Sequence, residues 1–173
     1  AGTRADVLRL AVPPRHARVE AETPTEPTPL DPPRIDRQAW ARYRFGEHFL
    51  DALGTDRTPR AAWQALPGEN WPLRLAELAA STAAAGRSAV LVVPDQRDLD
   101  RVLAACIDVA GADHVVGLSA GLGPAVRYRR WLSALRGTAR IVVGTRASVF
   151  APTPNLGLIV VWDDGDDLHA EPR

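Results

Sequence analysis

The sequence has neither lysine nor methionine, and all 21 of its basic side chains are arginines. They are balanced by 21 acidic side chains, so the formal net charge is zero. Without lysine, the chain cannot form a Schiff base, anchor pyridoxal phosphate or supply the lysine of a phosphate-binding loop. Because it also lacks an initiator methionine, we expect it to be a fragment of a longer protein with a GC-rich gene.

Cysteine and histidine are also scarce. The single cysteine excludes a disulfide framework and a four-cysteine zinc site within these 173 residues. The four histidines have no HxxH or HExxH spacing, so no metal site is predicted. No apolar run approaches the roughly 20 residues that span a bilayer, and no signal peptide is recognisable. The expected location is the reducing cytoplasm.

The remaining composition is that of an ordinary globular protein, with 46% hydrophobic and 24% charged residues. Residues 21–34 are rich in proline, threonine and glutamate, and we expect them to form a stiff, extended linker. A helical period follows over Asp36–Leu53, with Phe45, Phe49 and Leu53 on one face. These patterns predict a linker region over 1–34, a connecting helix over 35–57 and a larger domain over 58–173.

The larger domain alternates short apolar runs with amphipathic helical periods. The clearest helix is Gln96–Ala110, which Asp95 can cap and Gly111 ends. Continuous apolar runs joined through helices are typical of a parallel sheet covered on both faces. We therefore predict an open α/β domain of the nucleotide-binding type. The predicted strands are Ala61–Leu66, Ala89–Val93, Val115–Leu118, Ile141–Val143 and Leu158–Val161, and the two other predicted helices are Leu73–Ala85 and Pro124–Leu135.

Ligands of such sheets bind at the carboxyl ends of the strands, where several candidate groups stand. Residues 121–123 follow a strand as a dinucleotide-binding turn does, but the third glycine position is Val126, so a plain turn is favoured. Four carboxylates follow the last strand, where NTPases place their magnesium ligands. A solvated acidic turn is the competing interpretation. These carboxylates are Asp163, Asp164, Asp166 and Asp167.

Two stretches are candidates for nucleic-acid contact. One predicted helix alternates arginines with aromatic residues: Arg127, Tyr128, Arg129, Arg130 and Trp131. This pattern suits phosphate contact and base stacking, whereas the competing interpretation is a solvated charged face. Residues 144–146 end a strand with a glycine, a hydroxyl and a guanidinium, which together make a workable phosphate clasp. Cys106 lies on the apolar stripe of its helix and is interpreted as core packing.

Several stretches together resemble the PriA replication-restart helicases, also called primosomal protein N′. Residues 140–164, RIVVGTRASVFAPTPNLGLIVVWDD, are similar to the family's strand, GTRSAxFxP loop and following strand that leads into a DEEH box. Residues 85–99 match its strand ending in VPE. Residues 118–131 match its HSxL…R…W segment, with Ser119, Arg127 and Trp131 retained. The resemblance extends over residues 58–173, with the motifs in the family's order.

Membership of this family implies that residues 58–173 form a truncated first RecA-like lobe of a superfamily 2 helicase. It implies forked or single-stranded DNA as a ligand, in association with the nucleoid. The implied partners are primosome components, the replicative helicase or its loader, and single-strand-binding protein. Residues 1–34 would then lead from an amino-terminal DNA-binding domain. The second lobe and a zinc-binding module would lie beyond Arg173.

The sequence departs from the family at the two motifs that hold ATP and magnesium. In place of the GxTGSGKT loop, Trp71 takes the lysine position and Pro72 takes the position of the magnesium-binding hydroxyl. In place of DEEH, Trp162 replaces the first acid, and Asp163 and Asp164 remain as vestigial carboxylates. The degenerate nucleotide loop consists of Gly68, Glu69, Asn70, Trp71 and Pro72.

These departures lead us to expect that ATP with magnesium is not hydrolysed, because a phosphate cradle needs backbone N–H groups and a cation. The leading hypothesis is a degenerate, actinobacterial-type PriA that binds forked DNA and helps reload the replicative helicase. The alternatives are an active ATP-dependent 3′–5′ DNA helicase with unorthodox ligands, or a structural module that braces its neighbours. The residues expected to meet DNA phosphates are Arg127, Arg130, Gly144, Thr145 and Arg146.

Overall fold

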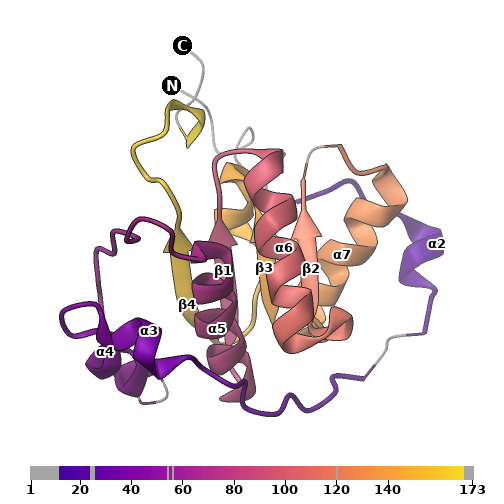
Figure 1. Ribbon diagram of the computed structural model, residues 1–173. Helices are drawn as coiled ribbons and strands as arrows, with labels where there is room; N and C mark the ends of the chain where they lie inside the picture. The colour runs from indigo at the N-terminus through magenta and orange to yellow at the C-terminus, as the bar shows by residue number, and fades with distance from the viewer. Residues whose placement is uncertain (1–11, 24–25, 54, 56, 120, 170–173) are drawn as a thin grey trace.

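The computed structural model describes residues 12–23, 26–53, 55, 57–119 and 121–169. Its centre is a four-stranded sheet in which every strand pairs in parallel, in the order β2-β3-β1-β4 (Figure 1). Val92 stands opposite both Gly144 and Val161, so the carboxyl ends of three neighbouring strands are level. The strands are β1 (Ser88–Val92), β2 (Val115–Leu118), β3 (Ile141–Gly144) and β4 (Leu156–Val161).

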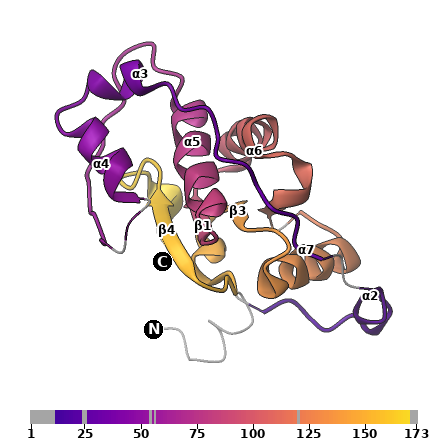
Figure 2. The same cartoon turned by 90° about the horizontal axis from the view of Figure 1, so that it is seen from below.

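Helices pack on both faces of this sheet. Helices α5 (Trp71–Ala84) and α6 (Gln96–Ala110) cover one face, where Leu91 and Val143 belong to the main core (Figures 1 and 2). On the other face, Val90 and Val142 pack with Ala134 of α7 (Pro124–Arg136). Burial on both faces explains the continuous apolar runs of β1 and β3. The predicted α/β fold with a parallel sheet is confirmed.

The ends of α6 follow the expected capping chemistry. The side chain of Asp95 accepts a hydrogen bond from the backbone N–H of Asp98 at 2.8 Å, and Gly111 ends the helix with φ at 85°. Cys106 on the same helix is fully buried, and burial raises the pKa of its thiol to about 12. Its interpretation as core packing is confirmed.

The amino-terminal residues wrap around the α/β core. After the short helix α2 (Ala17–Glu20), residues 26–36 form neither helix nor strand and run past the amino ends of the strands (Figures 1 and 2). Two further helices follow, α3 (Arg37–Ala41) and α4 (Gly46–Leu53). Trp40, Leu50 and Leu53 are buried in the main core with α5 and β1. Residues 37–53 are therefore an integral layer of the fold.

The single helix predicted over Asp36–Leu53 is wrong, because the chain turns between α3 and α4. Gly46 packs so tightly there that an added Cβ would lie 2.1 Å from the carbonyl oxygen of Trp40. Phe45 takes a left-handed conformation with φ at 65°, and its side chain is exposed. It therefore does not share the buried face of Phe49 and Leu53, as the helical period had predicted.

The strand predicted over Ala61–Leu66 is also wrong, since residues 57–66 form neither helix nor strand. Within the described residues β4 pairs only with β1 and is an edge of the sheet. The run 61–66 contains no β-branched residue, and Trp63 instead packs against the main core from outside the sheet. Three short 3₁₀ helices complete the described structure: Ala112–His114, Arg146–Phe150 and Asp167–His169. None of the helices in the described part of the chain is long and apolar enough to cross a membrane.

Candidate functional site

The degenerate loop lies at the carboxyl edge of the sheet, where α5 begins. Its backbone turns at Gly68, which has φ at 76°, and the N–H of Glu69 donates to the carbonyl of Leu66 at 3.0 Å. The side chain of Asn70 then caps α5 by accepting from the N–H of Leu73 at 3.4 Å. The loop thus forms an ordinary helix N-terminus, which the side chain of Asn70 caps.

Two tryptophans from separate elements meet directly beside this loop. Trp71 is the first residue of α5, and Trp162 follows β4, where its backbone N–H donates to the carbonyl of Val92 at 2.8 Å. The two indole rings stack with their centroids 4.1 Å apart and their planes 7° from parallel. The guanidinium of Arg101 on α6 lies 4.9 Å from the centre of the Trp71 ring. Trp71 therefore has an aromatic neighbour and a cationic one.

The stack continues into the interior as a chain of aromatic contacts that we call the aromatic column. Trp63 lies 5.7 Å from Trp162 and 5.6 Å from both Trp40 and Tyr43, measured between ring centroids. The column joins α5, the end of β4, the segment 57–66 and the region of α3. Its five members are Trp71, Trp162, Trp63, Trp40 and Tyr43.

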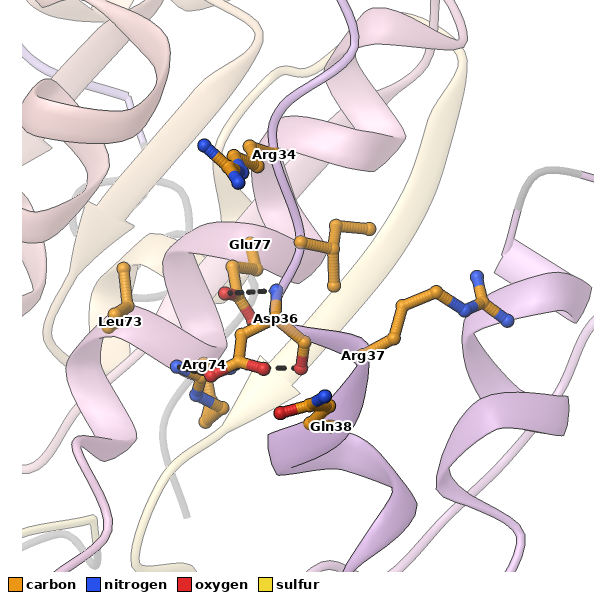
Figure 3. Close-up of a pocket in the computed structure, with 8 residues that line it drawn as sticks. Arg34, Asp36, Arg37, Gln38, Leu73, Arg74 and Glu77 are labelled. Atoms are coloured by element: carbon orange, nitrogen blue, oxygen red, sulfur yellow. Dashed lines mark hydrogen bonds and ion pairs between the residues drawn. The ribbon is translucent and has the colours of Figure 1, made fainter.

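Buried charges hold the inner end of the column. Glu77 of α5 is 2% exposed, and its carboxylate accepts from the indole Nε1 of Trp40 at 2.8 Å and from the backbone N–H of Asp36 at 3.1 Å. The guanidinium of Arg74, 4% exposed, donates to the same carboxylate at 2.8 Å. Figure 3 shows Asp36 of the incoming chain meeting Glu77 and Arg74. These three residues line a cavity of about 470 Å³.

The carboxylate of Glu69 in the degenerate loop is part of the same network. It accepts a hydrogen bond from the hydroxyl of Tyr43 at 2.9 Å and forms ion pairs with Arg74 at 3.4 Å and with Arg42 at 3.5 Å. Its side chain is almost completely buried. Arg74 is thereby paired with two buried carboxylates and, at 3.9 Å, with the more exposed carboxylate of Asp36. The charges of this network are compensated from within the protein.

The vestigial carboxylates of the second motif lie outside this network. Asp163 and Asp164 are exposed on the turn after β4, where Asp163 has φ at 52° and its carbonyl accepts from the N–H of Asp166 at 3.0 Å. Over the described part of the chain, no three His, Cys, Asp or Glu side chains gather closely enough to hold a metal ion.

The residues expected to contact DNA meet at one edge of the sheet. Leu118 at the end of β2 pairs with Gly144 at the end of β3. Arg127 lies in the first turns of α7, which follows β2, and Thr145 and Arg146 follow β3 directly. The structure therefore brings these three residues to the same end of neighbouring strands.

Two members of that set have structural roles of their own. The guanidinium of Arg130 donates to the carbonyl of Gly117 in β2 at 2.8 Å. An added Cβ at Gly144 would lie 1.8 Å from the hydroxyl of Ser148 and 2.6 Å from the carbonyl oxygen of Leu118, so only glycine fits there. Packing accounts for Gly144 without reference to a ligand.

Comparison with known proteins adds to this geometry. No family model matches the chain. The probable replication restart protein PriA of Mycobacterium tuberculosis (strain ATCC 25618 / H37Rv) is 59% identical over 174 residues, and that of Mycobacterium leprae (strain TN) is 58% identical over 176 residues. Both alignments cover this chain from end to end.

The chain belongs to the PriA replication-restart family. It spans only about a quarter of the length of these mycobacterial relatives, 26% and 27% respectively. The probable replication restart protein PriA of Deinococcus radiodurans is similar at 33% identity over 125 residues, which is 69% of this chain and 14% of that protein.

The PriA resemblance implies ATP and magnesium at the loop 68–72, and the residues present do not fit them. The indole rings of Trp71 and Trp162 stack on each other. Pro72 has no N–H to offer a phosphate, and the buried cation Arg74 is already paired with Glu69 and Glu77. Position 72 therefore offers no backbone N–H and the buried cation is already compensated, whereas a phosphate cradle needs both groups.

Sequence reasoning had identified Trp71 and Trp162 as separate replacements but missed that they contact each other. It also missed Glu77, and it placed Trp40 and Tyr43 on a mere connecting helix. One signal was available, since four of the five tryptophans belong to the aromatic column. A second was the pair Arg74 and Glu77, which lie one turn apart and are the only charged residues of α5.

The amino-terminal segment occupies part of the arginine-rich face of α7. Glu22 binds the guanidinium of Arg129 through both carboxylate oxygens, and Glu20 accepts a hydrogen bond from the hydroxyl of Tyr128 at 2.5 Å. The hydrogen bond with Glu20 raises the pKa of Tyr128. The same bond, together with that from Arg15, lowers the pKa of the Glu20 carboxyl. Two of the residues that suggested nucleic-acid contact are thus engaged within the chain.

Proposed function

We propose that this chain is part of a replication-restart protein that binds forked DNA and helps reload the replicative helicase without hydrolysing ATP. The observation that carries the proposal is the stack of Trp71 on Trp162, because these residues replace the lysine and the first acid of the family's two nucleotide motifs. In this chain the two positions instead contact each other through one aromatic stack. Membership of the PriA family supports the restart role.

The DNA-binding part of the proposal concerns the carboxyl edge of β2 and β3. Arg127, Thr145 and Arg146 follow the same ends of these two neighbouring strands, and guanidinium groups at such an edge suit the phosphates of a DNA backbone. Because phosphate contacts release counterions, their number determines how steeply affinity falls with salt.

The test of the motor is phosphate release from ATP by the complete protein, with and without forked DNA. We expect no release above background in a preparation that binds the fork. DNA-stimulated turnover that Asp163→Asn abolishes would contradict the proposal and favour an active helicase with unorthodox ligands.

The test of the DNA edge is the salt dependence of fork binding in Arg127→Ala and Arg146→Ala. Each is expected to reduce the slope of log affinity against log salt by about one. Arg129→Ala is the control, since it removes an arginine of the same helix whose guanidinium is held by both carboxylate oxygens of Glu22. Equal slopes in all the proteins would show that this edge does not contact phosphates.

The contacts between α2 and α7 favour a second candidate function, a module that braces its neighbours. Glu20 and Glu22 bind Tyr128 and Arg129 and so hold the amino-terminal segment against α7. Under this alternative, the Arg127 and Arg146 variants retain full fork affinity, while Glu22→Ala weakens the binding of a primosome partner.

A further inference from the structure

Phe45 is an exposed aromatic ring held in a rigid turn. Its side chain is 64% exposed, the highest value among the large apolar residues of the described chain. The turn is fixed on both sides, since Tyr43 N–H donates to Trp40 and Gly46 N–H donates to Tyr43, both at 3.0 Å. The close approach of Gly46 to the Trp40 carbonyl leaves no room for another residue there. The ring is therefore displayed from an ordered position.

The backbone at Phe45 is unfavourable for the residue that occupies it. With φ at 65°, it lies in the left-handed region, where glycine and asparagine are tolerated and a bulky aromatic is a clear outlier. Core packing does not offset this cost, because the ring belongs to none of the described hydrophobic clusters. Strained conformations of this kind are characteristic of functional positions.

A guanidinium and an imidazole contact the ring. The guanidinium of Arg44 lies over the ring at 4.9 Å from its centre, and His48 approaches its edge with ring centroids 6.3 Å apart. Within the described residues Arg44 has no acidic partner, whereas its neighbours Arg37 and Arg42 are paired with Asp51 and Glu69. The turn thus presents an apolar ring together with an uncompensated cation.

We propose that Phe45 and Arg44 form a stacking site for an unpaired base of single-stranded nucleic acid. An aromatic side chain offers a base a flat π surface, and an adjacent arginine meets the phosphate of the same nucleotide. The charge of Arg44 favours nucleic acid over a protein as the partner. If a protein received the Phe45 ring in an apolar pocket, the guanidinium of Arg44 would also lose its hydration. The inference rests on the proposed DNA-binding function and assigns it a second contact, on the turn between α3 and α4.

The decisive variant is Phe45→Asn in the complete protein. Asparagine suits the left-handed backbone better than phenylalanine, so the melting temperature is expected to stay unchanged or rise. Affinity for a labelled oligothymidylate, measured by fluorescence anisotropy, is expected to fall about tenfold, the scale of one lost base stack. Affinity for a blunt duplex is expected to stay the same. Improved folding with weaker binding separates a binding role from a structural one.

Two further variants complete the design. Phe45→Tyr keeps the ring and is expected to retain oligothymidylate affinity. Leu168→Ala removes a side chain of similar exposure, 57%, and is expected to have no effect. Unchanged oligothymidylate affinity in Phe45→Asn would overturn the inference while leaving fork binding intact. A fall in its melting temperature would also overturn it, because the ring would then be packed against another part of the protein. Failure of the unmodified protein to bind any DNA would overturn the proposed function itself.

Discussion

Trp71 lies between the guanidinium of Arg101 and the indole of Trp162, and each of these neighbours comes from a different element. An isolated tryptophan at either motif position would leave a large apolar surface unpaired at the edge of the sheet. Together they bury that surface against each other and attach the start of α5 to the end of β4. The positions of the family's lysine and first acid are thus joined here by a packing contact, and each tryptophan is explained by the other.

The stack predicts that Trp71 and Trp162 are energetically coupled. Trp71→Leu and Trp162→Leu should each destabilise the fold, and the double variant should lose less than the sum of the two. The expected coupling is about 1 kcal/mol, the value typical of an aromatic pair beyond its buried area. Urea unfolding of the four proteins measures it. Strict additivity would mean that the two rings do not interact.

Substitution of Glu77 is predicted to lower the unfolding free energy more, because Glu77 is the buried acceptor for three donors. In Glu77→Ala, Arg74 loses its closest ion-pair partner and the Trp40 indole N–H loses its acceptor. Breaking a buried pair by removing one side is expected to cost about 3–5 kcal/mol of unfolding free energy. Denaturant titration checks this, with Arg37→Ala as the control, since its pair with Asp51 is exposed and should contribute little.

At the scale of the elements, the sequence predicted most of the sheet and its helices, because periodicity reports burial directly. The helix predicted over 96–110 has the same bounds as α6, and the four observed strands were predicted to within two residues at each end. The failures have a common cause in tertiary contacts. Ala61–Leu66 has an apolar pattern but no neighbouring strand to pair with, and a helical period over 36–53 carries no sign that Gly46 must approach Trp40.

The stability of the contact between α2 and α7 is predicted to depend on pH with a bell-shaped profile. The lowered pKa of Glu20 means that its contribution is present above the ordinary carboxyl range and is lost as pH falls through the lowered value. The raised pKa of Tyr128 means that its contribution is present below the ordinary phenol range and is lost as pH rises through the raised value. Trp131, stacked on Tyr128, reports the contact by its fluorescence. Glu20→Gln should remove the acid limb, and an unchanged acid limb would assign it to another group.

At the scale of the whole molecule, the predicted boundary at residue 57 runs through a shared core. Trp40, Leu50 and Leu53 lie on the amino-terminal side of it, yet they are buried with residues of α5, α6 and the sheet. The candidate site spans the same boundary, since the aromatic column draws Trp40 and Tyr43 from one side and Trp71 and Trp162 from the other. Sequence patterns could not show this, because a helical period indicates that one face is buried but not which element covers that face.

This shared core predicts how the chain responds to shortening. Residues 58–173 alone should show no cooperative thermal transition, because Glu77 and Arg74 would lose their contacts with Asp36 and Trp40 and the apolar face of α5 would be uncovered. Residues 35–173 keep these contacts and should unfold cooperatively, with a midpoint close to that of residues 1–173. Thermal unfolding of the three proteins, followed by circular dichroism, measures whether each transition is cooperative and where its midpoint lies. A cooperative transition in 58–173 would show that the amino-terminal layer only lies against a domain that is complete without it, and that the column's inner half contributes little to the fold.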